Sequence, residues 1–345
     1  MDTETFLRRL PKGDLHLHLA GALRPATLVE LARKHDVPLR TTDPQHLYNF
    51  ADFYDFLDVV RAAASCIRDH GDFARVAYEC LADAAQAGNL KYAEMFFNPT
   101  DYLPAGVPYR TMAEGYAEGI RQAEADLGVT GRLIPSINRE LGPDTARQML
   151  DAVLEHRIEQ VIGIGMDGAE RSGPPEQYAE VYQAAGRAGL RRTAHTCEDN
   201  QTLAEAPPAN ITTTLDALGC DRIDHGYNIL GDPAVVRRCA EEDTPFTVCS
   251  HTCVPQRLTT RWKTLRTMQR AGLFMVVCTD DPPMYRTDIG TAYVTIAREL
   301  AQTPAEAAQS ALAALDATWL DDTDKRAQRK AFTDEIAALT IALEN

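Results

Sequence analysis

The sequence predicts an α/β fold, a closed (β/α)8 barrel of the TIM type, from two observations. Short apolar runs rich in β-forming residues alternate with segments of helical periodicity along the whole chain, which is the pattern of repeated β/α units. The chain has 345 residues, 45% of them hydrophobic, and barrels of this length fold as one domain. An open, doubly wound sheet is the alternative, although no Gly-x-Gly-x-x-Gly follows the first strand.

Eight segments are expected to form the strands of the barrel. They are residues 14–17, 90–97, 132–137, 160–164, 191–194, 222–224, 245–249 and 273–278. Two further segments are not part of the eight repeated units of a minimal barrel. Residues 41–87 are aromatic and largely helical, and we expect them to form a lid inserted after the first strand, whereas residues 303–345 should form extra helices at the C-terminus. We therefore expect a single domain, residues 1–345.

Charge and composition limit the partners of the chain. The formal net charge of −15 disfavours nucleic acids and anionic membranes, because both are polyanions. The eight cysteines are scattered, which favours free thiols in a reducing compartment. The acidic N-terminus lacks an apolar signal core, and no apolar run reaches the length of a membrane span. We expect a cytoplasmic protein with a small-molecule substrate, as a monomer or homo-oligomer.

Histidines and a carboxylate at strand ends predict a metal site. His16 and His18 alternate along the first strand and can therefore face one point together. His195 and Asp280 end later strands, and active sites of barrel enzymes lie at these carboxyl ends. Three imidazoles and one carboxylate suit zinc and imply hydrolysis. The alternative is a pair of structural imidazoles, although burying both without a partner is costly.

Three further residues are candidates for catalysis. Glu198 lies three positions after His195 and is either a general acid with a raised pKa or a charge at a helix N-terminus. His225 is suited to act as a base or to orient a water. Asp281 is adjacent to Asp280, and we interpret the pair as one substrate contact and one metal ligand. The alternative is that both are solvated acids in a turn.

Two absences narrow the chemistry. The expected fourth strand is followed by Gly165-Met166-Asp167-Gly168, with no lysine to bridge a pair of metals, so one metal is expected rather than two. The small zinc deaminases use His-x-Glu with Pro-Cys-x-x-Cys, and Cys249-Ser250-His251-Thr252-Cys253 has neither that spacing nor the proline. Cys249 and Cys253 are expected to be buried thiols, with metal binding as the alternative.

Four motifs occur in an order that resembles the adenosine/adenine deaminase family of the amidohydrolase superfamily. They are His16-Leu17-His18-Leu19-Ala20-Gly21, His195-x-x-Glu198, Asp224-His225-Gly226 and Thr279-Asp280-Asp281-Pro282. The resemblance covers nearly the whole chain and implies a (β/α)8 barrel with one zinc ion, held by His16, His18, His195 and Asp280. It also implies hydrolytic deamination of a 6-aminopurine nucleoside, adenosine or a modified adenosine, to the 6-oxopurine and ammonia.

The same resemblance implies roles for the remaining residues. Glu198 would protonate the purine at N1, and His225 would orient and deprotonate the attacking water. Asp281 would accept a hydrogen bond from the ring at N7, and the backbone N–H of Gly168 would reach N3, where glycine permits close approach. His18 would also contact the substrate. In the lid, Phe50 and Phe53 would shape the wall against the substrate, or would belong to an apolar stripe that packs on the barrel.

The chain departs from the family pattern around the substrate. Ala20 stands where adenosine deaminases carry Asp and adenine deaminases carry Glu, and Cys197, His251 and Gly165 also differ from the usual residues. A branch that deaminates aminodeoxyfutalosine or other substituted adenosines is resembled by Asp281-Pro282-Pro283-Met284-Tyr285, Gly165 and the aromatic segment from Phe50 to Phe56. Alternatives are an adenine deaminase, a non-deaminase amidohydrolase, or an inactive barrel used for binding.

Overall fold

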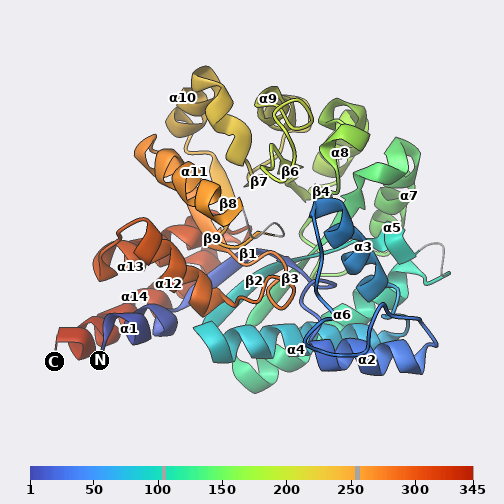
Figure 1. Ribbon diagram of the computed structural model, residues 1–345, viewed down its shortest axis with the longest axis horizontal. Helices are drawn as coiled ribbons and strands as arrows, with labels where there is room; N and C mark the ends of the chain where they lie inside the picture. The colour runs from blue at the N-terminus through green and yellow to red at the C-terminus, as the bar shows by residue number, and fades with distance from the viewer. Residues whose placement is uncertain (103–105, 253–256, 345) are drawn as a thin grey trace.

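The computed structural model describes residues 1–102, 106–252 and 257–344. Parallel strands form the centre of the molecule, and helices surround them (Figure 1). Cys253 and Asn345 lie outside the described residues, so the structure gives no placement for that thiol or for the last residue of the expected C-terminal helices.

The strands form one parallel barrel. They are β1 (Lys12–His18), β2 (Leu90–Phe97), β3 (Thr130–Asn138), β4 (Gly163–Asp167), β5 (Arg191–Arg192), β6 (His195–Thr196), β7 (Ile223–His225), β8 (Pro245–Cys249) and β9 (Phe274–Cys278). Hydrogen-bonded neighbours run from β1 to β5 and from β6 to β9 in chain order. The ring closes beyond β9, where the backbone N–H of Asp280 donates to His16 (2.9 Å) and that of His18 donates to Asp280 (2.8 Å).

β5 and β6 are two halves of one barrel strand. Between them the backbone N–H of Thr193 donates to the carbonyl of Ile164 (3.1 Å), and that of Asp224 donates to Ala194 (3.0 Å). Counting this pair once gives eight strands, so the expected (β/α)8 barrel is confirmed. The expected strand at 160–164 is displaced to β4, although Val161 keeps an isolated bridge to Leu133.

Helices cover the outside of the barrel. They are α1 (Thr3–Arg9), α2 (Pro25–Lys34), α3 (Phe53–Ala64), α4 (His70–Gly88), α5 (Pro99–Tyr102), α6 (Tyr109–Leu127), α7 (Gly142–Glu155), α8 (Ala179–Arg187), α9 (Ala209–Asp216), α10 (Pro233–Glu241), α11 (Leu258–Arg270), α12 (Ile289–Glu299), α13 (Pro304–Asp316) and α14 (Asp322–Glu344). None of the described helices is both long and apolar enough to cross a membrane.

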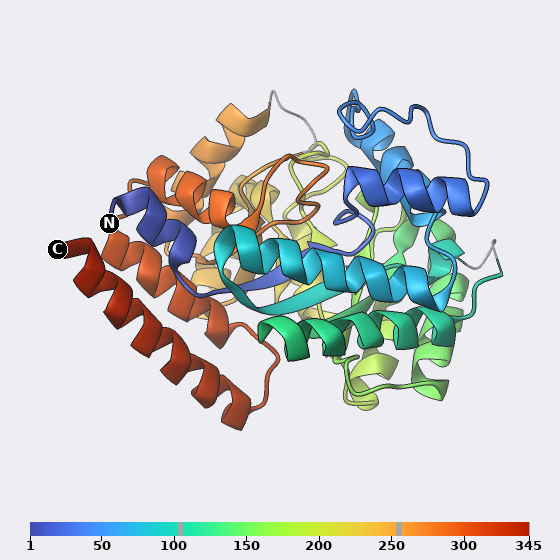
Figure 2. The same ribbon diagram turned by 90° about the horizontal axis from the view of Figure 1, so that it is seen from below.

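The segment expected to form the lid divides into two parts. α4 runs beside α6 in the outer layer (Figure 2), and their contact is close because a Cβ on Gly119 would lie 2.0 Å from the carbonyl oxygen of Ala74. α3 begins at Asp52, whose carboxylate accepts from the backbone N–H of Tyr54 and Asp55. α3 contributes side chains to the central cavity. We therefore keep the lid as a proposal for residues 41–64 and place α4 among the barrel helices.

The two ends of the chain meet beneath the barrel. The N-terminal ammonium donates to the carbonyl of Ala342 (2.7 Å), and both termini lie side by side in the two ribbon views (Figures 1 and 2). α13 packs against β1 and β9, and α14 packs against α1 and α13. Through these contacts the C-terminal helices cover the end of the barrel that faces away from the cavity.

Candidate active site

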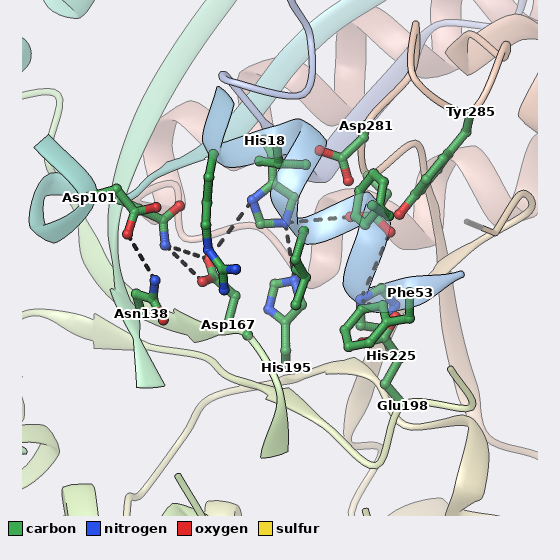
Figure 3. Close-up of a pocket in the computed structure, with 17 residues that line it drawn as sticks. His18, Phe53, Asp101, Asn138, Asp167, His195, Glu198, His225, Asp281 and Tyr285 are labelled. Atoms are coloured by element: carbon green, nitrogen blue, oxygen red, sulfur yellow. Dashed lines mark hydrogen bonds and ion pairs between the residues drawn. The ribbon is translucent and has the colours of Figure 1, made fainter. Parts of the chain in front are cut away.

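Four expected metal ligands converge at the carboxyl ends of the strands. One ligand atom from each of His16, His18, His195 and Asp280 lies within 4.8 Å of all the others. Asp280 Oδ1 lies 3.3 Å from His16 Nε2 and 3.4 Å from His18 Nε2. His18 Nε2 lies 3.0 Å from His195 Nε2 (Figure 3). Residues 264 positions apart in the chain, His16 and Asp280, thus meet where the barrel closes.

The donor chemistry of this cluster fits a metal ion. His16 Nε2 is fully buried and has no hydrogen-bond partner among the described residues, which is costly unless a cation takes its lone pair. Burial lowers the pKa of His18 to about 4 and that of His195 well below its usual range, so both imidazoles are neutral. Burial lowers the pKa of His16, but the carboxylates of Asp280 and Asp224 outweigh burial and raise it to about 10, so this imidazole must release its proton when a metal binds. Three imidazole nitrogens and one carboxylate form a ligand set that zinc prefers.

Asp224 orients two of these imidazoles from behind. Its carboxylate accepts from the hydroxyls of Thr193 and Thr247 (both 2.8 Å) and lies 3.6 Å from His16 Nδ1 and 3.7 Å from His195 Nδ1. Burial raises the pKa of Asp224, but the hydrogen bond and charge of His16 outweigh burial and hold it at about 2. An ionised carboxylate on the far side of the rings fixes the orientation and the tautomer of each imidazole, so that its other nitrogen faces the metal.

Three residues of the site have left-handed backbone conformations. The φ angles are 62° at Cys197, 70° at His225 and 66° at Asp280, and each such conformation costs about 1–3 kcal/mol in a residue other than glycine. Backbone hydrogen bonds hold the strained positions, since Asn228 N–H donates to the carbonyl of Cys197 (2.8 Å) and Asp280 N–H donates to His16. The strained backbone therefore lowers stability, but it places the side chains of His225 and Asp280 in the cavity.

Glu198 is a buried carboxyl group beside the cluster. Burial, together with the neighbouring charge of Asp280, raises the pKa of Glu198 to about 8. Its Oε1 accepts from the side-chain amide of Asn200 (2.5 Å) and lies 3.8 Å from His225 Nε2. Glu198 is therefore largely protonated at neutral pH and has a proton to donate.

His225 faces both Glu198 and the metal ligands. Its Nε2 lies 3.9 Å from Asp280 Oδ2, and its Nδ1 lies 3.3 Å from the hydroxyl of Tyr227. Burial lowers the pKa of His225 to about 3. A neutral imidazole at this position has a nitrogen that can accept a proton from a water above the cluster.

Asp281 and Gly168 lie on opposite sides of the same cavity. Asp281 is 3% exposed, and burial together with the adjacent carboxylate of Asp280 raises its pKa well above the usual range. A Cβ on Gly21 would lie 1.7 Å from Asp281 Oδ1, so glycine at this position makes room for the carboxyl group. Gly168 has a φ of 87° and lines the cavity.

The cavity has an apolar wall and a polar wall. Phe53 and Phe56 of α3, with Leu57 and Val60, line the first, and Tyr285 lines the cavity beside them. Phe50 does not line the cavity but packs behind this wall, with its ring 5.2 Å from that of Phe56. The polar wall comes from Asn98 and Asp101, which follow β2, and from Asn138 and Asp167, which end β3 and β4. Asp101, Asn138 and Asp167 are labelled in Figure 3.

The residues that depart from the family pattern have diverse surroundings. Cys197 is buried and its thiol donates to the carbonyl of Ala206 (3.5 Å). His251 is half-buried, its Nδ1 lies 2.7 Å from the hydroxyl of Ser250, and it does not line the cavity. Asp167 lines the cavity and lies 4.0 Å from His18 Nδ1, so it faces a predicted ligand and not His251.

Sequence reasoning missed a buried ion pair behind Glu198. Arg139 donates to the carbonyl of His195 (2.7 Å), and its Nη1 lies 3.9 Å from Glu170. Glu170 accepts from the backbone N–H of Glu198 (3.2 Å) and from the side chain of Asn210 (2.8 Å). The pair fixes the loop that carries both a ligand and the acid. No local motif signals it, because Arg139 and Glu170 follow different strands.

The fold and the site together define a class of protein. Barrels that gather imidazoles and a carboxylate at the carboxyl ends of their strands, with a proton donor and a base beside them, activate water for hydrolysis. The chain is a metal-dependent hydrolase of this kind.

The chain belongs to the adenosine deaminase family, whose model matches residues 11–338. It is 35% identical to an adenine deaminase of Streptomyces coelicolor over 324 residues, covering 92% of this chain and 93% of that protein. An amidohydrolase from Burkholderia ambifaria, solved with bound zinc, is 35% identical with a TM-score of 0.89, covering 99% of this chain and 94% of that one. Adenine deaminase from Arthrobacter aurescens is 30% identical with a TM-score of 0.86, covering 96% and 99%. Membership confirms the resemblance and identifies a metal-dependent aminohydrolase.

Proposed function

We propose that this chain removes the 6-amino group of a purine by hydrolysis, giving the 6-oxopurine and ammonia. The observation that carries the proposal is the arrangement of Glu198, His225 and Asp281 around one cavity whose floor is the ligand cluster. An aromatic ring accepts water at C6 only when its adjacent nitrogen is protonated, and Glu198 is a neutral carboxyl group at neutral pH. An amidohydrolase acting on an ester or lactam has no need of such a ring-protonating acid.

Zinc is the proposed metal, with His16, His18, His195 and Asp280 as its ligands. The donor set and the unpartnered nitrogen of His16 support this assignment, and a relative of similar fold was solved with zinc. When bound, zinc supplies Lewis-acid chemistry that lowers the pKa of water.

The chain's own residues carry the proton transfers. Glu198 donates its proton to N1 of the ring as water adds to C6, and His225 accepts a proton from that water. Asp281 binds the ring at N7, and its raised pKa supplies a hydrogen for a nitrogen that accepts. The backbone N–H of Gly168 binds N3. His225 then passes the proton it accepted to the amino nitrogen, and the bond between C6 and that nitrogen breaks to release ammonia. The proton on N1 stays in the 6-oxopurine, and the second proton of the added water restores Glu198.

For the substrate we propose a nucleoside, adenosine or a modified adenosine such as aminodeoxyfutalosine. The cavity continues beyond the catalytic groups to the polar residues of β2, β3 and β4, which leaves a place for a substituent on the ring. Free adenine is the second candidate, and the observation that favours it is the name adenine deaminase on several relatives of 30% identity or more.

A substrate panel tests the proposal. Zinc-loaded protein is incubated with adenosine, deoxyadenosine, adenine, N6-methyladenosine and aminodeoxyfutalosine, and ammonia release is followed together with the ultraviolet shift from 6-amino to 6-oxo purine. We expect turnover of at least one nucleoside above the rate with adenine. Turnover of adenine alone selects the second candidate, and no turnover with zinc bound contradicts purine deamination.

A further inference from the structure

The cavity contains four polar residues that the deamination chemistry does not use. Asn98, Asp101, Asn138 and Asp167, which we call the polar end, lie on one side of His18, whereas Glu198, His225, Asp281 and Tyr285 lie on the other (Figure 3). The polar end comes from β3, β4 and the residues after β2. A buried polar group at an active site is retained at a cost unless it binds something.

Hydrogen bonds within the polar end fix its side chains. The amide of Asn98 donates to both oxygens of Asp167 (2.8 Å each), and the hydroxyl of Ser136 donates to Asp167 as well (2.8 Å). The amide of Asn138 donates to Asp101 Oδ1 (2.8 Å), and the backbone N–H of Glu140 holds the amide oxygen of Asn138 (3.0 Å). The polar end is therefore rigid before any ligand arrives.

One acceptor of the polar end is left open. Asp101 Oδ2 has no hydrogen bond to any residue in the described part of the chain, although Oδ1 is held by Asn138. Burial raises the pKa of Asp101 to about 6, and no cation is paired with it among the described residues. An open carboxylate oxygen in a substrate cavity is an acceptor for a hydroxyl or an N–H group.

The charge of the cavity excludes an anionic partner. The carboxyl groups of Asp101 and Asp167 both line its polar end. Arg61 is the single arginine or lysine among the described lining residues, and it already donates to Glu140 (2.5 Å) and Asp58 (3.2 Å). A phosphate at the polar end would meet carboxylates without a free guanidinium.

We propose that the polar end selects an uncharged, hydrogen-bond-donating substituent on the purine, such as the hydroxyls of a sugar, with Asp101 as the specificity-determining acceptor. The inference rests on the proposed function and adds that phosphorylated purines are rejected. Asp101 would then supply a hydrogen bond to the substrate that Ala20 cannot make, since the alanine methyl offers no hydrogen bond.

The test measures kcat and KM of the zinc-loaded protein with adenosine, 2′,3′-dideoxyadenosine, adenine and AMP. For the unmodified chain we expect kcat/KM for AMP to lie at least about 100-fold below that for adenosine, because unpaired like charges cost several kcal/mol. Asp101→Ala should raise KM for adenosine about tenfold or more with little change in kcat. The same variant should leave adenine unchanged, since adenine has no sugar hydroxyls, and it should cost 2′,3′-dideoxyadenosine, which keeps only the 5′-hydroxyl, no more than adenosine.

Two further variants complete the design. Asp101→Asn keeps an acceptor oxygen but loses the charge, so it should lose less affinity for adenosine than Asp101→Ala and should narrow the difference between adenosine and AMP. Asp151→Ala is the matched control, because Asp151 is exposed on α7 and does not line the cavity. Its kinetics should equal those of the unmodified chain.

The outcomes separate the two proposals. Equal losses for adenosine and adenine in Asp101→Ala, or AMP turnover equal to that of adenosine in the unmodified chain, would overturn the role of the polar end while purine deamination stands. Turnover of adenine without adenosine would also overturn it. No turnover of any of the four purines would overturn the proposed function, and this inference with it.

Discussion

The two halves of the barrel both bury charged side chains, but they partner those charges differently. Toward the amino ends of the strands, both terminal nitrogens of Arg222 are engaged: Nη1 pairs with Glu94 and Nη2 donates to the carbonyl of Leu15 (2.9 Å). The guanidinium also stacks on Trp319 at 4.0 Å. Glu94 accepts in addition from the hydroxyl of Tyr92 (2.8 Å) and the backbone N–H of Trp319 (2.7 Å).

At the carboxyl ends several buried groups lack such partners. His16 Nε2 and His195 Nδ1 have no hydrogen bond among the described residues, and Glu198 has a pKa raised to about 8 by burial. Satisfied charges support the fold, whereas unsatisfied ones are stabilised only when a metal or substrate arrives. The comparison predicts that changes at the carboxyl ends affect activity and that changes at the amino ends affect stability.

The largest expected effect is loss of a metal ligand. Asp280→Ala should bind zinc far more weakly and lose activity by on the order of 10³-fold or more, because the metal supplies several kcal/mol of transition-state stabilisation. Metal content after dialysis and ammonia release check this prediction. Asp281→Asn is the matched control and should keep its zinc. Full zinc content in Asp280→Ala would remove Asp280 from the ligand set.

Next in size is the loss of the proton donor. Glu198→Gln should keep zinc bound and reduce kcat by roughly 10²- to 10⁴-fold, as expected for a general acid. In the unmodified chain, kcat should fall as pH rises through about 8, because the pKa of Glu198 is about 8 and only its protonated form donates. A rate that keeps rising above this pH, or an active Glu198→Gln, would exclude the acid role.

The same carboxyl group links stability to pH. Its pKa is about 8 in the folded chain against an ordinary value of 4.5, so the folded state holds the proton more tightly. This contribution to stability is fully present below about pH 4.5 and is lost as pH rises through about 8. Urea unfolding across this range should show a shallower decline in Glu198→Gln. Identical slopes would contradict the raised pKa.

The amino half supplies the next prediction, a large stability effect with a small catalytic one. Arg222→Met leaves Glu94 buried and without its cation, which should lower the free energy of unfolding by about 3–5 kcal/mol. Activity per folded, zinc-loaded molecule should fall far less than in Glu198→Gln, because Arg222 meets the site through Asp224, whose Oδ1 lies 3.9 Å from its Nε. Arg191→Met is the control, because its pair with Asp221 is largely exposed and such pairs contribute about 0–1 kcal/mol. A selective loss of kcat in Arg222→Met would break the division between the halves.

The smallest expected effect comes from the residue that supports His225. Tyr227→Phe removes the hydroxyl that lies 3.3 Å from His225 Nδ1, and one hydrogen bond of this kind contributes about 0.5–1.5 kcal/mol. We expect kcat to fall by about tenfold or less with zinc content unchanged. Tyr78→Phe, whose hydroxyl bonds to Asp126 on the surface, should be neutral. An equal effect in both variants would remove the support role.

Much of the fold could be predicted from local sequence patterns. The expected strands at 90–97 and 245–249 coincide with β2 and β8, because both are short runs dominated by apolar and β-forming residues. The fifth strand is less regular, and its interruption between Arg192 and His195 has no local signal. β4 begins three residues later than expected, since Gly163 and Gly165 interrupt the apolar pattern.

The site likewise has residues that could be predicted from local sequence patterns and residues that could not. His16, His18, His195 and Asp280 could be found because alternation along a strand and position at strand ends are local properties. Asp224, Arg139 and Glu170 act on them through contacts between different strands, so their roles appear only when the barrel closes. The left-handed backbone at His225 and Asp280 is also not predictable, because only a few per cent of residues other than glycine have positive φ, even though Asp and His are enriched among them.

Metal titration of the metal-free chain tests the central claim most directly, namely that the unpartnered groups at the carboxyl ends form one zinc-dependent deaminase site. Zinc is added in steps to protein stripped by a chelator, and ammonia release from adenosine is measured at each step with the amount of zinc bound. The account predicts that activity rises linearly and saturates at one zinc per chain. Activity that is independent of zinc, or saturation without any ammonia release, would contradict it.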